Sequence, residues 1–372
     1  MTSLATTPTC SSPPSDGITS LTFHKTTLLS SSWDGTIRLY QSSPSSSSST
    51  TSSSSPKESV PCQATINVED SPILDACFGE SSYHDDAGPD SLPPVYTGSL
   101  DGNLFEVSVS DGKKKLIGSH EPSTSNSNSN SNSNSNSNSI SCVGYAGSGI
   151  VITAGWDHKL KIWDMQNPQS QPQTFPLPGK AFSMSVSVAT GQILVGTSGR
   201  RLVIFRVGRA GSGSGSTPSC EQMQDRESTL KYQTRVVRWL GDGGGFAVGS
   251  IEGRVAIEYV DEKKKGYAFK CHRVEDTVYP VNALAFHPTW GTFASGGCDG
   301  VVNIWDYESK KKLTTIAGFP TSVSAVAFDE SGGRVAVASS YTFEEGEKDA
   351  PGDEIYVREI FEFEVRGKGG KS

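Results

Sequence analysis

The chain has 372 residues, among them 39 glycines and 20 prolines, and its hydrophobic content is 34%. This length suffices for one large domain, and the polar excess is concentrated in a few tracts, so the remainder can still bury a full core. The net charge of −8 argues against a global basic field that would draw the chain to nucleic acid or to a membrane surface.

One short pattern occurs three times along the chain, at residues 31–40, 154–164 and 296–306. Each copy has small residues, an aspartate at a tight turn, an alternating strand, and an aromatic residue six positions after the aspartate. Weaker copies follow the same order at 100–107, 196–205, 250–259 and 355–358. Recurrence of one β unit is the signature of a repeat fold, in which each unit buries its apolar face against its neighbours.

The strands of these copies end near seven positions, namely 40, 106, 163, 205, 259, 305 and 358. The intervals from 163 to 205 and from 259 to 305 match the roughly 40–45 residues of a four-stranded propeller blade. Another alternating strand precedes several copies, for example at 281–286, and a period of two places one face of it in the core. The sequence therefore predicts an all-β fold. It is a single seven-bladed WD40 β-propeller over residues 1–372, with blades ending near those positions.

Four low-complexity stretches interrupt the repeat. They are a Ser/Thr tract at 42–55, an Asn-Ser repeat at 123–139, a Gly/Ser stretch at 208–216 and an acidic stretch at 342–352. None can bury enough apolar surface to offset the entropy lost on ordering. We expect disordered insertions in surface loops, and we assign no function to them.

Three Asp-Gly pairs, at 34–35, 101–102 and 299–300, lie between alternating strands. This dipeptide favours the positive φ values of a type I′ turn, so each pair predicts a hairpin tip. The aspartate can accept hydrogen bonds from the amides of the turn, and we expect a structural rather than a catalytic role for it.

Sequence signatures of catalysis or of metal binding are absent. The chain lacks the glycine-rich phosphate loop, the His-Glu-x-x-His zinc motif and the Gly-x-Ser-x-Gly nucleophile elbow. Its six histidines are scattered, and none of its seven cysteines forms a Cys-x-x-Cys pair, so we expect reduced thiols of an intracellular protein without a signal peptide. We predict no enzyme, no metal and no cofactor, and instead a scaffold whose loops bind partners.

Two tryptophans occupy one slot of the repeat, immediately before the aspartate of the hairpin. These are Trp33 and Trp156, and an indole there is expected to lie at a hairpin tip. Tryptophan is enriched among the residues that dominate binding interfaces, so we predict that both contact a partner; the alternative is packing against a neighbouring blade. Trp163 and Trp305 lie on the alternating strand and are expected in the core.

Two arginines flank the fifth unit, each near the start of a strand. They are Arg235 and Arg254, and their guanidinium groups suit a carboxylate or a phosphate. A salt-bridged surface position is the alternative for each. Lysine triplets at 113–115, 263–265 and 310–312 predict solvated loops between strands, with weak contact to nucleic acid as the alternative.

Several stretches resemble the shared core of two related groups of WD-repeat proteins: mitotic spindle-checkpoint proteins of the "budding uninhibited by benzimidazoles" type, and messenger-RNA export factors that dock on a nucleoporin. The stretches common to both are 226–235, 249–259 and 267–273. The stretches closer to the checkpoint group are 16–23, 31–34, 279–286, 300–306, 319–322, 338–341 and 351–358. The resemblance covers nearly the whole chain except the four insertions, which depart from the family.

The resemblance implies a non-enzymatic adaptor of the spindle-assembly checkpoint. Family members bind a short motif of the checkpoint kinase and of its pseudokinase relative, and Trp33 and Trp156 match the tryptophans of that face. Members also bind phosphorylated Met-Glu-Leu-Thr repeats of the kinetochore scaffold, for which Arg235 and Arg254 match the basic positions. The resemblance further implies contribution to the complex that inhibits the mitotic ubiquitin ligase, and residence in the nucleus, at kinetochores in mitosis and in the cytoplasm.

Export of messenger RNA through nucleoporin binding is the alternative function. A third class, the substrate receptor of a ubiquitin ligase, would need a docking motif that the sequence lacks.

Overall fold

The computed structural model describes residue 4 and residues 7–41, 59–80, 91–120, 138–209 and 216–367. Its strands form one antiparallel sheet after another along the chain. Blade 1 contains β1 (Ile18–His24), β2 (Thr27–Ser32), β3 (Thr36–Gln41) and β4 (Cys62–Asn67). Blade 2 contains β5 (Ile73–Phe78), β6 (Val95–Ser99), β7 (Asn103–Val107) and β8 (Lys114–Ser119). Blade 3 contains β9 (Ile140–Tyr145), β10 (Ile150–Gly155), β11 (Lys159–Asp164) and β12 (Gln173–Pro176).

The next two blades are again four-stranded. They contain β13 (Ala181–Ser187), β14 (Gln192–Thr197), β15 (Arg201–Arg209) and β16 (Pro218–Glu227); β17 (Thr234–Trp239), β18 (Gly245–Ser250), β19 (Arg254–Tyr259) and β20 (Tyr267–Lys270). A small hairpin of β21 (Arg273–Val274) and β22 (Thr277–Val278) follows them.

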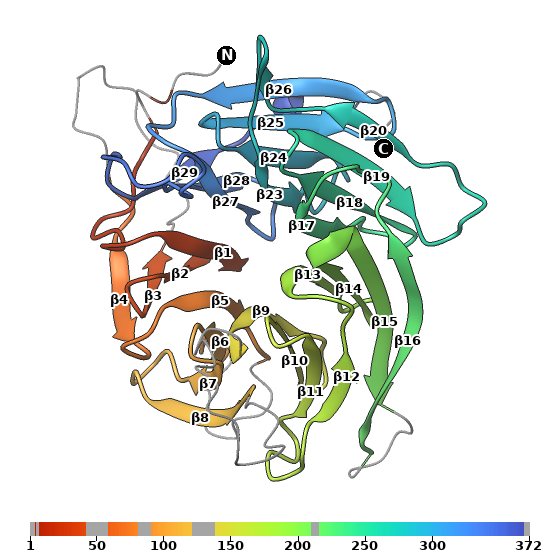
Figure 1. The fold of residues 1–372 in the computed structure, drawn as a ribbon. Helices are drawn as coiled ribbons and strands as arrows, with labels where there is room; N and C mark the ends of the chain where they lie inside the picture. Colours follow the sequence, from red (N-terminus) through yellow and green to blue (C-terminus); the bar gives the residue numbers. More distant parts are fainter. Residues whose placement is uncertain are drawn as a thin grey trace.

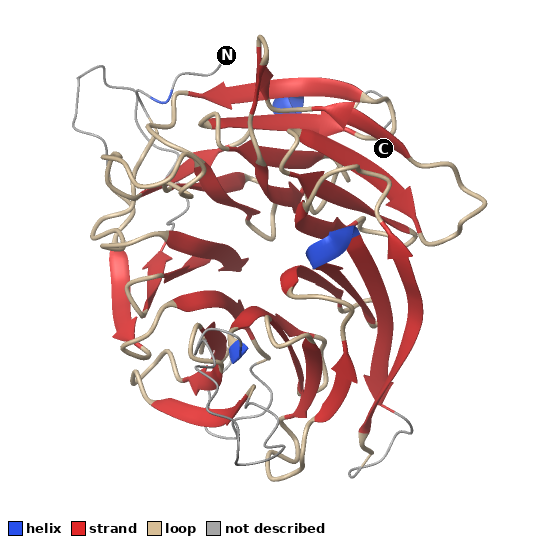
Figure 2. Ribbon diagram, in the orientation of Figure 1, coloured by secondary structure: helices blue, strands red, loops and turns tan. Residues whose placement is uncertain are grey.

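The sixth blade is four-stranded and the seventh has three strands of its own. They contain β23 (Val281–Phe286), β24 (Phe293–Gly297), β25 (Val301–Asp306) and β26 (Lys311–Ala317); β27 (Val323–Phe328), β28 (Arg334–Ser339) and β29 (Glu354–Glu359). The short helix α1 (Glu362–Val365) is the last element of the described chain. Figure 2 shows how strongly strands dominate the fold. In the described part of the chain, no helix combines the length and the apolar character needed to cross a membrane.

The sheets are arranged in a ring, with the first strand of each nearest the centre (Figure 1). Successive inner strands pack against one another around the ring, and β27 of the last blade packs against β1 of the first. The core lies between adjacent blades; one cluster, for instance, joins Ile152 and Leu160 of blade 3 to Ile193 and Phe205 of blade 4. The prediction of a seven-bladed WD40 β-propeller is therefore confirmed.

The N-terminal segment closes the ring. Thr9 pairs with Tyr356 of β29, the outer strand of blade 7, and Cys10 pairs with Val60 just before β4. The Cys10 amide donates to the Ile355 carbonyl at 2.8 Å, and the Val60 amide donates to the Thr9 carbonyl at 3.0 Å. The segment thus supplies blade 7 with its missing edge and ties it to blade 1.

Each repeat motif forms the third strand of its sheet. The seven positions predicted from the sequence lie at or near the ends of β3, β7, β11, β15, β19, β25 and β29, and a fourth strand follows in the first six sheets. Lys114 and Lys115 begin β8, and Lys311 and Lys312 begin β26, so the prediction of loops was wrong for these lysines. An outer strand with one face in water accepts lysine readily.

The predicted insertions fall mostly outside the described residues. This holds for 42–55, for 123–137 and for 210–215, whereas Gly208 and Arg209 still belong to β15. The acidic stretch 342–352 is described and forms a loop without strands. In that loop the Tyr341 hydroxyl donates to the Gly346 carbonyl at 2.8 Å, and Ser322 donates to Glu344. Disorder of the four insertions stays a prediction.

The hairpin turns differ from the predicted type I′. Gly35, Gly102 and Gly300 have φ values of 76°, 84° and 66°, whereas the aspartates before them keep negative φ. The Gly35 amide donates to the Ser32 carbonyl, so Trp33 and Asp34 form the centre of a type I turn and the glycine that follows adopts the left-handed conformation. The Asp-Gly pair therefore lies one residue later in the turn than the type I′ prediction assumed.

Two blades carry a buried polar network beside this turn. In blade 3, Thr153 Oγ1 lies 2.7 Å from Nε2 of His120 and accepts a hydrogen bond from Nε1 of Trp163 at 2.8 Å, while Nδ1 of His120 lies 3.0 Å from Asp157. In blade 6, His272, Ser295, Trp305 and Asp299 repeat the arrangement. Trp163 and Trp305 are 6% and 9% exposed, which confirms that both lie in the core. The networks fix the hairpin tips relative to their blades.

Candidate partner-binding face

The four predicted site residues lie on one face of the ring. Because the strands are antiparallel, the turn between the second and third strands lies at the same end of a blade as the start of the inner strand; Ile18 pairs with Ser32 in blade 1, and Thr234 pairs with Ser250 in blade 5. Trp33 and Trp156 occupy such turns in blades 1 and 3. Arg235 and Arg254 lie near the starts of β17 and β19 in blade 5. We call this end of the ring the hairpin face.

Trp33 is exposed at the tip of the first hairpin. Its side chain is 43% exposed, and its amide donates to the Gly17 carbonyl at 2.9 Å. The indole lies directly against Gly17, where an added Cβ would come within 3.2 Å of the ring. The structure therefore places a flat apolar surface on the hairpin face instead of burying it between blades.

Asp34 holds this hairpin in position. Its carboxylate accepts hydrogen bonds from the amides of Thr36 at 3.1 Å and Ser15 at 3.0 Å and from the Arg38 guanidinium at 2.9 Å. Although burial favours the neutral form, these hydrogen bonds to Thr36, Ser15 and Arg38 lower the pKa of Asp34 to about 2. The structural role predicted for the aspartate of the turn is confirmed at this position.

Trp156 is half-buried on its hairpin. The Lys180 ammonium lies 5.8 Å from the centre of its indole, and its amide donates to the Ser139 carbonyl at 2.9 Å. Its Nε1 atom is buried, and no acceptor for it exists among the described residues. A buried donor without an acceptor is costly. Because the protein itself covers this atom, a partner can touch the exposed part of the indole but not Nε1.

Arg235 belongs to a ring of bulged residues. Each inner strand has a β-bulge at its second residue. This residue has no pairing partner in the second strand of the blade. The bulged residues all line the central channel; they are Thr19, Leu74, Ser141, Phe182, Arg235, Asn282 and Ser324. The bulge turns the exposed Arg235 side chain toward the mouth of the channel, and it is the single cation of this ring.

Arg254 lies farther out on the same blade. Its side chain is 36% exposed, and its Nε atom lies 3.4 Å from the carboxylate of Glu252 in the adjoining turn. A phosphate that approaches Arg254 would therefore share the guanidinium with Glu252. The structure brings Arg235 and Arg254 to one blade but does not join them to Trp33 and Trp156 in one pocket. Blade 4 lies between the arginines and Trp156, and blades 6 and 7 lie between the arginines and Trp33.

The channel behind Arg235 contains two further charges. Its volume is about 450 Å³, and Asp75 and Arg238 are among its lining residues. Burial raises the pKa of Asp75 to about 6, although the Val143 amide, which donates to it at 2.9 Å, and the charge of Arg238 oppose this. Burial likewise lowers the pKa of Arg238. Asp75 accepts a backbone amide of the next blade, so its role is to join blades 2 and 3.

The structure shows three exposed apolar side chains on this face that the sequence did not single out. Ile251 is 40% exposed and occupies the same slot as Trp33 and Trp156, directly before Glu252. Tyr232 is 56% and Phe182 is 39% exposed; Tyr232 precedes the inner strand β17, and Phe182 is the bulged second residue of the inner strand β13. Alignment of the repeat slots would have found Ile251 and Phe182, whereas Tyr232 lies in a connection between blades, where the repeat has no fixed pattern.

Seven sheets around a channel, with hairpin aspartates joined to buried histidine and tryptophan side chains, define a WD-repeat β-propeller. The family model described as "WD domain, G-beta repeat" matches residues 5–41, 129–164 and 263–306. The chain is 38% identical to "Mitotic checkpoint protein BUB3.1" of Arabidopsis thaliana, over 96% of this chain and 94% of that protein. It is 35% identical to "Mitotic checkpoint protein bub3" of Dictyostelium discoideum, over 94% and 93%. The chain belongs to the Bub3 family of mitotic checkpoint proteins.

Messenger-RNA export factors are more distant relatives. The chain is 28% identical to "mRNA export factor GLE2" of Chaetomium thermophilum, over 90% of this chain and 84% of that protein. The resemblance to the checkpoint group is therefore confirmed, and the order of the two groups agrees with the sequence stretches given above. Propellers of the Bub3 type are generally not catalysts.

Proposed function

We propose that this checkpoint protein is an adaptor that binds two kinds of peptide on its hairpin face. A short motif of a checkpoint kinase, or of its pseudokinase relative, lies against Trp33 and Trp156. A phosphorylated Met-Glu-Leu-Thr repeat of the kinetochore scaffold is bound by Arg235 and Arg254. The protein thereby carries the kinase to unattached kinetochores and supports inhibition of the mitotic ubiquitin ligase, with residence in the nucleus and at kinetochores.

The observation that carries the proposal is the common orientation of the four residues. The exposed indole of Trp33, the half-buried indole of Trp156 and the guanidinium groups of Arg235 and Arg254 all belong to the same end of their blades. A phosphothreonine carries nearly two negative charges and forms charge-assisted hydrogen bonds with arginine. The separation between blades 1–3 and blade 5 supports two peptide sites on one face instead of one.

The phosphate site is tested by titrating phosphorylated and unphosphorylated Met-Glu-Leu-Thr peptides into the protein. We expect Arg235→Ala and Arg254→Ala each to lose about 1.5–3 kcal/mol of binding free energy for the phosphorylated peptide, as for a hydrogen bond to a charged group. Arg206→Ala is the control, because Arg206 is an exposed arginine on β15 of another blade. Equal affinity for the two peptides would refute the assignment.

The kinase site is tested with Trp33→Ala. We expect this variant to lose about 2 kcal/mol or more of affinity for the kinase-derived peptide, as for other interface tryptophans, and to unfold at the wild-type temperature because the indole is half exposed. Trp163→Ala is the contrasting variant and should unfold at a lower temperature, since Trp163 is buried. If Trp33→Ala unfolds as readily as Trp163→Ala, the indole has a core role.

The export alternative is separated from the checkpoint function by localisation. We expect the protein at kinetochores in cells arrested in mitosis, together with the kinase in pull-downs from those cells. Residence at nuclear pores throughout mitosis, with recovery of a nucleoporin alone, would favour export and contradict the proposal.

A further inference from the structure

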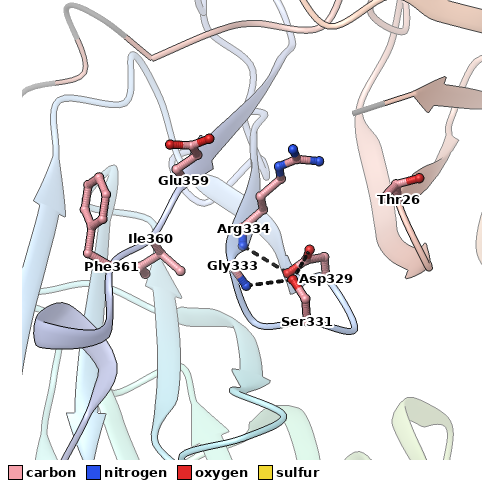
Figure 3. Close-up of a pocket in the computed structure, with 8 residues that line it drawn as sticks. All are labelled: Thr26, Asp329, Ser331, Gly333, Arg334, Glu359, Ile360 and Phe361. Carbon is pink, nitrogen blue, oxygen red and sulfur yellow. Dashed lines mark hydrogen bonds between the residues drawn. The ribbon is translucent and has the colours of Figure 1, made fainter. Parts of the chain in front are cut away.

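A second candidate surface lies on the face opposite the hairpin face. A cavity of about 300 Å³ opens there between blades 7 and 1 (Figure 3). Thr26 of the β1–β2 turn lies on one side of it. Asp329 of the β27–β28 turn and Arg334 at the start of β28 form its base, and Glu359 at the end of β29 lies with Phe361 on the other side. The turns between first and second strands all lie at this end of the blades, so the cavity, here called the rear pocket, is remote from the four residues of the proposed function.

The base of the rear pocket is a rigid turn. Asp329 accepts hydrogen bonds from the Arg334 amide at 2.9 Å and from the Ser331 hydroxyl at 2.7 Å, and Ser331 accepts one from the Gly333 amide. Nε2 of His287 lies 2.9 Å from the Gly332 carbonyl, and any side chain at Gly332 would collide with the His287 ring. The turn is therefore formed before any partner arrives.

The segment after β29 is fixed with equal firmness. The Ile360 amide donates to the Gly333 carbonyl at 2.9 Å, which joins the segment to the turn. Glu364 is 2% exposed; it accepts two hydrogen bonds of 2.8 Å from Arg358 and one of 3.0 Å from the Phe361 amide. Val365 is buried at 1% exposure. These contacts hold α1 against the propeller.

This anchorage leaves two phenylalanines in water. Phe361 is 53% exposed and Phe363 is 81% exposed, and their rings are stacked at 5.7 Å with an interplanar angle of 5°. We call them the phenylalanine pair. Large rigid aromatic side chains at the rim of a cavity bind partners well, because they have already lost the conformational entropy that binding would otherwise cost.

The charges of the pocket indicate what would bind. Asp329 and Glu359 line it against one cation, Arg334, and Glu330 of the same turn is 57% exposed at its side chain. Glu330 already accepts the Lys25 amide at 2.8 Å, so it is directed toward the blade 1 side of the cavity. The excess of carboxylate around an exposed aromatic pair is complementary to a segment that combines apolar and basic side chains.

We propose that the rear pocket and the phenylalanine pair form a docking surface for a partner protein, through a short segment that carries an aromatic or large aliphatic residue next to lysine or arginine. The apolar residue packs on Phe361 and Phe363, and the cation reaches the exposed carboxylate of Glu359. Because this surface and the hairpin face lie at opposite ends of the blades, both can be occupied at once. The inference goes beyond the proposed function and does not rest on it.

The test is a selection from a phage-displayed library of random peptides about twelve residues long, carried out on the full chain. We expect enriched peptides to contain an aromatic or large aliphatic residue beside lysine or arginine. Their affinity should fall at least about tenfold in the double variant Phe361→Ser/Phe363→Ser and in Glu359→Lys. Tyr232→Ser, which removes an exposed aromatic from the hairpin face, should leave it unchanged. Thermal unfolding of each variant establishes that it is folded.

Three outcomes would overturn the proposal. The first is equal binding of the enriched peptides to the double variant and to wild type, and the second is enrichment of acidic residues in place of basic ones. The third is a dimer of the full chain in analytical ultracentrifugation that the double variant abolishes, which would make a second copy of the chain the occupant. The double variant should still bind the phosphorylated Met-Glu-Leu-Thr peptide. Retained binding shows that its hairpin face is intact, so the rear pocket is tested separately from the proposed function.

Discussion

Single polar side chains decide how the hairpins of this propeller are held. His120 and His272 are both fully buried, and each connects an aspartate of a turn to a hydroxyl and a tryptophan of the core. This pairing cannot be predicted from the sequence, since each histidine lies in a connection that precedes its hairpin, 37 and 27 residues before its aspartate. Proximity across a folded chain is not visible in local spacing.

The buried histidine of blade 3 gives the stability of the protein a dependence on pH. Burial lowers the pKa of His120 more strongly than the neighbouring Asp157 raises it, so the unfolded chain binds the proton more readily than the folded chain. We therefore expect the contribution of His120 to stability to be lost as the pH falls below the ordinary histidine pKa of about 6.5.

This dependence is measured by urea unfolding of wild type and His120→Gln at pH 7.5 and pH 5.5. The variant should lose less stability between the two pH values than wild type does. His158→Asn is the control, because His158 is exposed and adopts a left-handed φ of 63° that asparagine tolerates. An equal loss in wild type and His120→Gln would contradict the assignment.

At the scale of the element, the hairpin between second and third strands combines a predictable and an unpredictable part. Its existence follows from the repeat, and so does the identity of the third strand. Its turn type does not, because the dipeptide Asp-Gly suits both a type I′ turn and a type I turn followed by a left-handed glycine. The choice is made by contacts outside the hairpin, such as the Val68 amide, which donates to the Gly35 carbonyl at 3.0 Å.

Alanine substitutions at Gly35 and Gly112 separate the cost of a left-handed backbone conformation from the cost of a steric collision. Gly35 and Gly112 have similar φ values, 76° and 67°, but an added Cβ at Gly35 would lie 2.2 Å from the Glu69 carbonyl oxygen, whereas at Gly112 it meets open space. We expect Gly112→Ala to cost about 1–2 kcal/mol, the strain of the left-handed conformation alone.

Gly35→Ala should cost at least about 2 kcal/mol more than Gly112→Ala, since the backbone of the next connection must also move. Chemical denaturation of the two variants beside wild type measures the difference. Similar losses in the two variants would mean that the hairpin of blade 1 relaxes freely, and that Trp33 is less firmly positioned than the structure indicates.

For the whole molecule, the sequence predicts the number of blades and their inner and third strands, because these obey the repeat. It does not predict what completes the ring. The strand that completes blade 7 lies at the opposite end of the chain, at Thr9 and Cys10, and α1 with its phenylalanine pair follows the last repeat. The site residues likewise fall into a predictable and an unpredictable group. Trp33 and Arg235 are predicted from the repeat and from the family resemblance, whereas Tyr232 and the rear pocket lie in connections that have no periodic sequence pattern.

The closure of the ring is tested at a single amide. Cys10→Pro removes the donor to the Ile355 carbonyl while a small side chain is retained, and Cys10→Ala leaves that hydrogen bond intact. We expect Cys10→Pro to lower the free energy of unfolding by about 3 kcal/mol or more, with faster amide exchange in β29, and Cys10→Ala by less than about 2 kcal/mol. Equal effects of the two substitutions would show that side-chain packing alone holds the segment.

The pairing of Thr9 and Cys10 with β29 also constrains how the protein is made. These residues are synthesised long before their partner strand, which is completed only at Glu359, after all the other blades. The N-terminal segment can pair with Val60 of blade 1 early, but the side of it that pairs with β29 remains without its partner, and the propeller closes only once β29 has emerged from the exit tunnel. A nascent chain that stalls before residue 354 cannot close its ring, however well its earlier blades have folded.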